Sequence, residues 1–299
     1  MATVLLTGAT GYIGSHTWLA LAQAGFEVVG IDNFSNSSPE VLSRLQALMG
    51  AAPRFEQTDV CDAAAMNALF ARQRIDATVH FAASKAVGES TQQPLAYYAN
   101  NIGGLLTVCE AMRSHGCQRF VFSSSATVYG QPERLPITEN APLAATSPYG
   151  QTKLMAEQIL RDHGVAEPTW QTACLRYFNP VGAHESGTIG EDPRGTPNNL
   201  MPYVAQVAVG RRPRLQVYGQ DYPTPDGHLC HIGHQVVRHA ARVLADAATL
   251  VCTDRIEVAQ AGRLPAGLGS AKVAQDLLGH QLGLTVGAGG GERGIFVDG

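Results

Sequence analysis

The sequence predicts an α/β fold, a doubly wound parallel sheet followed by a smaller C-terminal region. Short apolar runs alternate with amphipathic segments as far as residue 178, which is typical of strands and helices in turn. A glycine-rich turn follows the first apolar run directly. From about residue 179 to residue 227 the alternation stops, and Gly and Pro become frequent. We therefore expect one domain over residues 1–178 and a substrate-binding region over residues 179–299, which is loop-rich as far as residue 227.

The apolar runs have the length and composition of strands that are buried on both faces. They are Val4 to Leu6, Val28 to Asp32, Val79 to Ala82, Phe120 to Ser123, and Cys174 to Tyr177. The amphipathic segments between them are Ser15 to Ala24, Ala64 to Gln73, Gly103 to Ser114, and Tyr149 to Asp162. Strict alternation requires right-handed crossovers, so we expect helices on both faces of one parallel sheet.

The composition narrows the class of function. The chain has 299 residues, 45% of them hydrophobic and 15% charged, and a net charge of −4. Beyond Arg211-Arg212-Pro-Arg214 it lacks the basic clusters of a nucleic-acid-binding protein. No apolar run is long enough to cross a membrane, and the first residues lead into a glycine turn rather than a signal-peptide cleavage region. We expect a cytoplasmic protein with a small-molecule substrate, no nucleic acid and no membrane.

The six cysteines lack the C-x-x-C spacing of metal and redox sites and are too sparse for a disulfide framework. We expect reduced thiols. His228, His231 and His234 recur at a spacing of three, but no acidic or thiolate cluster accompanies them beyond Cys230. We therefore expect no metal site.

The glycine turn reads Gly8-Ala-Thr-Gly11-Tyr-Ile-Gly14. It follows a predicted strand and opens a predicted helix, the setting in which glycines let the backbone approach a pyrophosphate. The helix N-terminus then faces that anion. Strand, turn and helix together predict a Rossmann-type dinucleotide site.

Two acidic residues end apolar segments after the turn. Asp32 stands eighteen residues past Gly14, at the end of the second predicted strand. A carboxylate there hydrogen-bonds a ribose 2′-hydroxyl and repels a 2′-phosphate, which favours NAD over NADP. Capping of a nearby loop is the alternative role for Asp32. Asp59 lies in the segment from Phe55 to Val60, where its side chain could reach the adenine.

Tyr149 and Lys153 stand four residues apart in Ser147-Pro-Tyr-Gly-Gln-Thr-Lys153, so a helix presents both on one face. A neighbouring ammonium favours the phenolate, and the usual tyrosine pKa of about 10 can then fall towards working pH. Tyr149 could take a proton from an alcohol. An ordinary helix with a Tyr and a Lys is the alternative, and the glycine turn favours the catalytic interpretation.

Five longer sequence segments also favour an enzyme with a dinucleotide site. These sequence words are Thr7–Gly14, His80–Ser90, Phe122–Gly130, Arg176–His184 and Asn198–Arg211. With these words the chain resembles the extended short-chain dehydrogenase/reductase superfamily, and within it the UDP-glucose 4-epimerases (UDP-galactose 4-epimerases). The resemblance runs from residue 3 to about residue 227.

The resemblance implies a tightly held NAD and a UDP-hexose substrate. The implied cofactor residues are Gly8, Gly11, Tyr12, Ile13, Gly14, Asp32, Asn33, Asp59, Val60, Phe81, Ala82, Lys85, Asn100, Tyr149, Lys153 and Phe178. The implied substrate residues are Ser125 and Tyr149 at the sugar hydroxyl, Asn179, Asn199 and Leu200 at the uracil-diphosphate end, and Tyr218.

Several of these positions keep a second interpretation. Lys85 could be a solvated surface lysine, and Phe178 could belong to the core. Asn179 precedes a proline, so it could serve a turn. Asn198 and Asn199 precede an apolar run and could cap a helix.

The implied reaction is the interconversion of UDP-galactose and UDP-glucose, an isomerase reaction of galactose and carbohydrate metabolism. NAD takes a hydride from C4 of the hexose, while Tyr149 takes the hydroxyl proton, Ser125 orients the oxygen and Lys153 lowers the Tyr149 pKa. Similar 4,6-dehydratases carry an Asp-Glu pair where this chain has Ser125-Ala126-Thr127, which favours epimerisation. Another sugar-nucleotide dehydrogenase or epimerase is the alternative.

The resemblance also implies a homodimer, through a helix bundle that includes Gly103 to Ser114.

The resemblance stops after Gly227. Epimerases continue with an Arg-Asp-Tyr-Ile-His word, whereas this chain reads His228-Leu-Cys-His-Ile-Gly-His234. Nineteen of the twenty aromatic residues precede residue 228, although a substrate lobe uses aromatic residues in its core. We hypothesise a change of reading frame near Gly227, which leaves residues 228–299 atypical. A catalytically silent NAD-binding protein is the corresponding alternative function.

Overall fold

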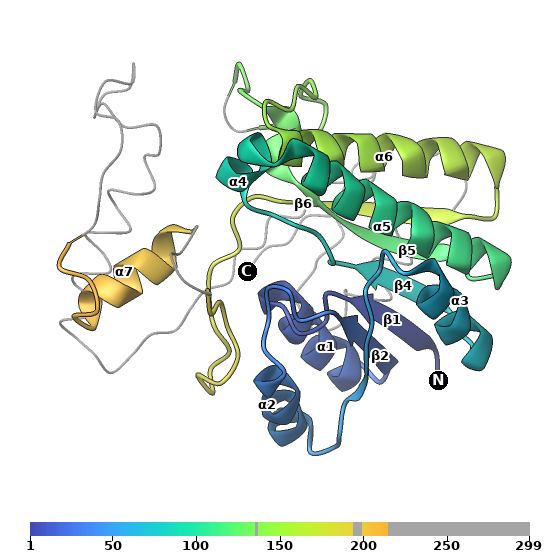
Figure 1. Ribbon diagram of the computed structural model, residues 1–299, viewed down its shortest axis with the longest axis horizontal. Helices are drawn as coiled ribbons and strands as arrows, with labels where there is room; N and C mark the ends of the chain where they lie inside the picture. The colour runs from blue at the N-terminus through green and yellow to red at the C-terminus, as the bar shows by residue number, and fades with distance from the viewer. Residues whose placement is uncertain (135–136, 194–198, 215–299) are drawn as a thin grey trace, which may run out of the picture.

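The structure is a computed structural model that describes residues 1–134, 137–193 and 199–214. Its core is a six-stranded parallel sheet in the order β3-β2-β1-β4-β5-β6, with helices on both faces (Figure 1). The doubly wound parallel sheet predicted from the alternation of apolar and amphipathic segments is confirmed.

The strands are β1 (Thr3–Thr7), β2 (Glu27–Asp32), β3 (Arg54–Gln57), β4 (Ala77–His80), β5 (Arg119–Ser125) and β6 (Gln171–Tyr177). The helices are α1 (Tyr12–Gln23), α2 (Glu40–Met49), α3 (Ala63–Arg72), α4 (Val87–Gln92), α5 (Pro94–Ser114), α6 (Pro148–Ala166) and α7 (Leu200–Ala208), with a 3-10 turn η1 (Ala126–Tyr129). All five predicted strands and four predicted helices are present. Strand β4 ends two residues earlier than predicted, and α5 begins nine residues before the predicted segment.

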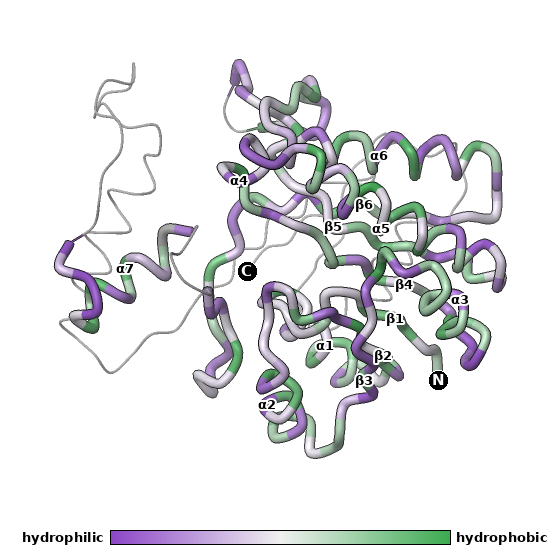
Figure 2. The backbone as a smooth tube through the Cα atoms, in the orientation of Figure 1, coloured by the Kyte–Doolittle hydropathy of each residue, from purple (hydrophilic) through white to green (hydrophobic). Residues whose placement is uncertain are grey.

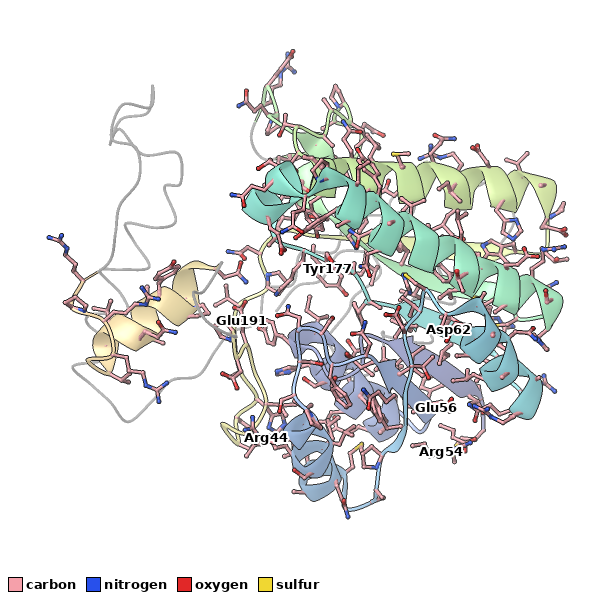
Figure 3. All side chains as sticks on the ribbon, viewed as in Figure 1. Arg44, Arg54, Glu56, Asp62, Tyr177 and Glu191 are labelled. Atoms are coloured by element: carbon pink, nitrogen blue, oxygen red, sulfur yellow. The ribbon has the colours of Figure 1, made fainter. Side chains whose placement is uncertain are left out.

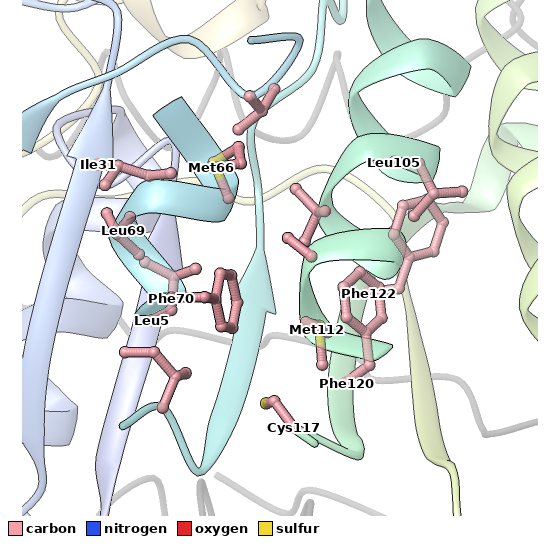
Figure 4. Close-up of a cluster of buried hydrophobic side chains, with 14 of the residues drawn as sticks. Leu5, Ile31, Met66, Leu69, Phe70, Leu105, Met112, Cys117, Phe120 and Phe122 are labelled. Atoms are coloured by element: carbon pink, nitrogen blue, oxygen red, sulfur yellow. The ribbon is translucent and has the colours of Figure 1, made fainter. Parts of the chain in front are cut away.

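Two apolar cores lie on opposite faces of the sheet. On one face α3, α5 and α6 pack on the strands, and Figure 4 shows side chains of this core, with Phe70, Met112 and Phe120 among them. On the other face α1 and α2 pack through Trp18 and Leu45. Gly30 makes the second contact possible, because a Cβ there would lie 2.0 Å from the Trp18 ring. Figure 2 shows hydrophobic and hydrophilic residues alternating along the helices, the pattern of amphipathic segments.

The strand order creates a switch point between β1 and β4. From β1 the chain passes outward to β2 and β3, then returns to place β4 on the other side of β1. The loops that leave these two strands therefore diverge at the carboxyl edge of the sheet. Ligands of doubly wound folds bind in that crevice.

After β6, residues 179–193 fold back towards α1 and α2. Ala183 and Gly190 form an antiparallel bridge, and Ile189 is buried in the core with Trp18. Arg44 of α2 donates a hydrogen bond to the backbone oxygen of Thr188 at 3.3 Å. This loop is irregular, as predicted, whereas α7 is a helix that lies away from the sheet in Figure 1. None of the helices in the described ranges is long and apolar enough to cross a membrane.

Candidate active site

A cleft of about 720 Å³ opens at the carboxyl edge of the sheet, around the switch point. Most of the residues that the sequence singled out line it. They are Gly8, Gly11, Tyr12, Ile13, Gly14, Asp32, Asn33, Val60, Phe81, Ala82, Lys85, Asn100, Ser125, Tyr149, Lys153, Phe178, Asn179 and Asn199. Gly8 and Asn199 of this set stand 191 positions apart in the sequence.

The fold alone therefore assembles this set, because β1, β4, β5 and the loop after β6 meet at that edge.

The glycine turn forms a tight connection between β1 and α1. Gly8 has a φ of +65°, and a Cβ there would lie 2.8 Å from the Ala82 nitrogen. A Cβ on Gly14 would lie 2.1 Å from the Gly8 oxygen. Helix α1 begins after Gly11 without a side-chain cap and has no acidic residue in its first turn. The start of α1 therefore carries neither a side-chain cap nor a carboxylate of its own first turn, which suits an anion in the cleft.

Asp32 organises the loop that follows β2. Its carboxylate accepts hydrogen bonds from the backbone nitrogens of Thr10 (3.1 Å) and Phe34 (2.9 Å) and from the Ser37 hydroxyl (3.1 Å). The bond to Thr10 ties this loop to the glycine turn. Asp32 thus caps nearby backbone, as the alternative interpretation held, and also lines the cleft.

Asp59 differs from the other predicted cofactor residues, because it is not among the residues that line the cleft. Its carboxylate accepts hydrogen bonds from the backbone nitrogen of Cys61 at 2.8 Å and from the Asn33 side chain at 2.9 Å. These two bonds lower the pKa of Asp59. Asp59 therefore acts on the cleft indirectly, by orienting Asn33.

Tyr149 and Lys153 lie on the buried face of α6, which packs beside the end of β5. Ser147 caps this helix by accepting a hydrogen bond from the Gly150 nitrogen at 3.1 Å. Lys153 Nζ donates to the backbone oxygen of Ser123 at 2.7 Å. The two side chains predicted to share a helix face therefore both reach the cleft beside β5.

Ser125 stands where β5 passes into η1. Its Oγ accepts hydrogen bonds from the Thr127 nitrogen (3.2 Å) and the Thr127 hydroxyl (3.0 Å). A hydroxyl oxygen has two acceptor sites, so the Ser125 proton is left for donation. Ser125 also hydrogen-bonds the Tyr149 side chain. The serine is thus oriented to donate to the phenol oxygen.

The ionisation of the pair differs from the sequence-based expectation. Burial raises the pKa of Tyr149, and the hydrogen bond from Ser125 opposes that rise. Burial lowers the pKa of Lys153 to about 8. The ammonium lies 5.8 Å from the centre of the Tyr149 ring and is directed at Ser123. In the protein by itself, desolvation therefore outweighs the Ser125 hydrogen bond, and the Tyr149 pKa rises instead of falling.

The comparison with family models agrees with this geometry. Residues 4–228 match the NAD dependent epimerase/dehydratase family, which is three quarters of the chain. The chain belongs to this family. The resemblance that the sequence words indicated is confirmed.

Two relatives and one solved structure illustrate the similarity of this epimerase/dehydratase family member to known proteins. A UDP-glucose 4-epimerase of Bacillus subtilis is 58% identical over 224 residues, 75% of this chain and 66% of the relative. UDP-glucose 4-epimerase 1 of Oryza sativa is 55% identical over 75% of this chain and 64% of its own length. The crystal structure of the Bifidobacterium longum UDP-glucose 4-epimerase in complex with NAD+ and UDP superposes with a TM-score of 0.73 at 48% identity, over 82% of this chain and 74% of that one. The chain thus spans slightly less than two thirds of the length of these curated relatives.

His80 is the last residue of β4, and the sequence pattern assigned no role to it. Its Nδ1 lies 2.9 Å from the Thr7 hydroxyl, and Thr7 Oγ1 accepts a hydrogen bond from the Ala82 nitrogen at 3.2 Å. Burial, with a contribution from the Lys153 charge, lowers the pKa of His80 to about 3. A neutral His80 thus supports the loop after β4.

Glu191 is a second residue that sequence reasoning missed. Its carboxylate lies 3.7 Å from Lys85 Nζ and accepts a hydrogen bond from the Asn199 side chain. Figure 3 labels Glu191 on the loop beside the cleft, and Arg44 near the turn of the same loop. Glu191 therefore joins a predicted cofactor residue to a predicted substrate residue. Its surroundings in the Gly- and Pro-rich stretch carry no motif that could have indicated this.

Tyr177 also lines the cleft and was not selected. Its position at the carboxyl end of a predicted strand could have indicated it, because ligands bind at that edge.

Among the predicted substrate residues, Tyr218 lies outside the described residues, as do His228 and the whole segment affected by the frame hypothesis. Within the described ranges no group of His, Cys, Asp and Glu is arranged to hold a metal ion.

Proposed function

We propose that this chain is a UDP-glucose 4-epimerase that interconverts UDP-galactose and UDP-glucose with a tightly bound NAD. One observation carries the proposal: Ser125, Tyr149 and Lys153 line the same cleft as the glycine turn. The Tyr149 phenol can exchange a proton with a substrate alcohol, and the glycine turn suits a dinucleotide. Together in one cleft they suit the oxidation and reduction of that alcohol. The relatives named UDP-glucose 4-epimerase support the choice of reaction.

The residues of the cleft fit NAD. The start of α1 suits a diphosphate, because it has neither a side-chain cap nor an acidic residue in its first turn. Asp32 lies at the end of β2, where a ribose 2′-hydroxyl would be accepted and a 2′-phosphate repelled. Lys85, Asn100 and Lys153 would complete the contacts. Bound NAD would supply the hydride acceptor and donor, which no side chain provides.

The protein's own groups manage the proton. Tyr149 would accept the proton of the hexose C4 hydroxyl and later return it. Ser125 would donate to the same oxygens and keep them aligned, since Thr127 occupies both of its acceptor sites. Lys153 would contribute positive charge beside them. The segment Ser125-Ala126-Thr127 lacks the carboxylates that a dehydratase needs as acid and base, which supports epimerisation.

The nucleotide end of the substrate would be held by Asn179, Asn199 and Leu200. Asn179 and Asn199 line the cleft, whereas Leu200, the first residue of α7, is not among its lining residues. Glu191 fixes the Asn199 side chain by accepting its hydrogen bond. An anchored nucleotide would let the sugar turn over between the two hydride transfers.

The test is conversion of UDP-galactose to UDP-glucose by the purified full chain, measured together with its NAD content after denaturation. We expect turnover and bound NAD. Bound NAD without turnover of either nucleotide sugar would favour the silent NAD-binding protein instead. Absence of both would refute the proposal.

We also propose a cytoplasmic homodimer. Leu95 and Leu106 of α5 and Met155 of α6 are exposed apolar side chains on neighbouring helices, which supports association through these helices. The four cysteines of the described ranges are free thiols, as in proteins of reducing compartments. Light scattering after size exclusion would test the dimer, and Leu106→Glu should shift it towards monomer.

A further inference from the structure

A buried charged network lies behind the proposed catalytic residues, between α6, β5 and β6. The guanidinium of Arg176 donates to both carboxylate oxygens of Glu157, at 2.9 and 2.6 Å. It also donates to the Tyr129 hydroxyl at 2.9 Å. The Ser124 hydroxyl donates to Glu157 at 2.5 Å. Glu157 and Arg176 are 3% and 6% exposed, and neither lines the cleft.

The placement of this network follows the spacing of α6. Tyr149, Lys153 and Glu157 recur every four residues, and all three are buried on one face of the helix. Each contacts a different residue of one β5 tripeptide, residues 123–125: Tyr149 with Ser125, Lys153 with the Ser123 oxygen, and Glu157 with the Ser124 hydroxyl. The helix is therefore fastened to the strand at three successive residues.

We propose that Glu157 is a positioning residue that fixes the register of α6 on β5 by accepting the hydrogen bond of Ser124. This inference rests on the proposed epimerase function. The contact of Glu157 with Ser124 sets the neighbouring Ser125 and Ser123, and thereby the place of Tyr149 and Lys153. Arg176 also donates a hydrogen bond to Tyr129, the last residue of η1, and so connects the turn after Ser125 to the same network.

An ion pair is not needed for stability alone, because buried pairs can be replaced by apolar residues of similar volume at little cost. The Glu157 carboxylate also supplies an acceptor for the Ser124 hydroxyl. The positioning role of that acceptor can therefore be tested apart from any effect of the ion pair on stability. The test therefore removes the two charges in both variants and the acceptor in only one of them.

The experiment compares two double variants of the full chain. Glu157→Gln with Arg176→Met removes both charges and keeps an oxygen that can accept from Ser124. Glu157→Met with Arg176→Met removes the charges and that acceptor. We expect kcat of the first within about threefold of the wild type and kcat of the second lower by about 10- to 100-fold, with KM for UDP-galactose little changed in both. Equal kcat in two equally stable double variants would overturn the inference.

A second readout does not depend on turnover. Hydrogen exchange measured by mass spectrometry over residues 119–130 and 148–160 should be about fivefold faster in the Met/Met variant than in the Gln/Met variant. Ser124→Ala, which leaves the ion pair intact, should show the same local acceleration. The control is Asp162→Asn on the exposed face of α6, which should leave exchange and kcat unchanged. Unchanged exchange in Ser124→Ala would overturn the register role even if the proposed epimerase activity were absent, whereas an inactive wild type with the expected exchange would refute only the activity.

Discussion

Lys153 Nζ donates a hydrogen bond of 2.7 Å to the backbone oxygen of Ser123, although the two residues stand 30 positions apart in the sequence. This contact directs the ammonium along the end of β5. The price is desolvation, which lowers the pKa of Lys153 to about 8. The residue that the proposed reaction needs is thus a source of instability in the fold.

Lys153→Met should therefore raise stability and lower activity. At pH 7 the charged lysine disfavours the folded state, so the substitution should add about 1–3 kcal/mol to the free energy of unfolding. The gain should shrink as the pH rises from 8 towards 10.5, because the folded wild type loses its proton there before the unfolded chain does. Urea unfolding at pH 7 and pH 9.5 measures the difference. A loss of stability at pH 7 would contradict this account.

Tyr149→Phe should lower kcat by about 10²- to 10⁴-fold, because it removes the proposed proton acceptor. Only one oxygen is lost, so the thermal transition and the NAD content should remain close to those of the wild type. Tyr98→Phe on α5 is the matched control, because Tyr98 does not line the cleft. Near-normal turnover of the Tyr149 variant would exclude Tyr149 as the base.

His80 should make the fold sensitive to mild acid. Its pKa is about 3 in the folded protein and about 6.5 in an unfolded chain, so the unfolded state binds the additional proton between these values. Stability should be complete above pH 6.5 and fall as the pH drops towards 3, by about 2 kcal/mol at pH 5.

The variant His80→Asn, which can still accept from Thr7, should lose that part of the pH dependence. His115→Asn at an exposed position should keep it. Chemical unfolding at pH 7 and pH 5 compares the three proteins, and an identical acid response in all of them would rule out His80 as its source.

Gly14→Ala should destabilise the protein by about 1–3 kcal/mol and release NAD, because the new Cβ would meet the Gly8 oxygen at 2.1 Å. Gly103→Ala is the matched control. A Cβ at Gly103 would meet no atom within 4 Å, and the helical position favours alanine by about 0.5–1 kcal/mol. Thermal melts and NAD content measure both, and equal effects of the two substitutions would be inconsistent with the strained turn.

The local parts of the site could be predicted from the sequence. The glycine turn depends on a few neighbouring residues, and so does the shared helix face of Tyr149 and Lys153. The five predicted strands could be recognised because strands buried on both faces form continuous apolar runs. Strand β3 was missed because it lies at the edge of the sheet, where two of its four residues, Arg54 and Gln57, are exposed.

Only the tertiary structure decided how these parts face one another. Contacts such as Lys153 with Ser123 and Glu157 with Arg176 join segments that the crossovers bring together, and helical or strand periodicity contains no information about such pairs. Burial, which depends on all the surrounding elements, decided that the Tyr149 pKa rises instead of falling. The sequence by itself determined which side chains are present and on which local face they lie, because those properties follow from spacing. The packing of α6 on β5 determined which residues these side chains contact and, through burial, the direction in which the Tyr149 and Lys153 pKa values shift.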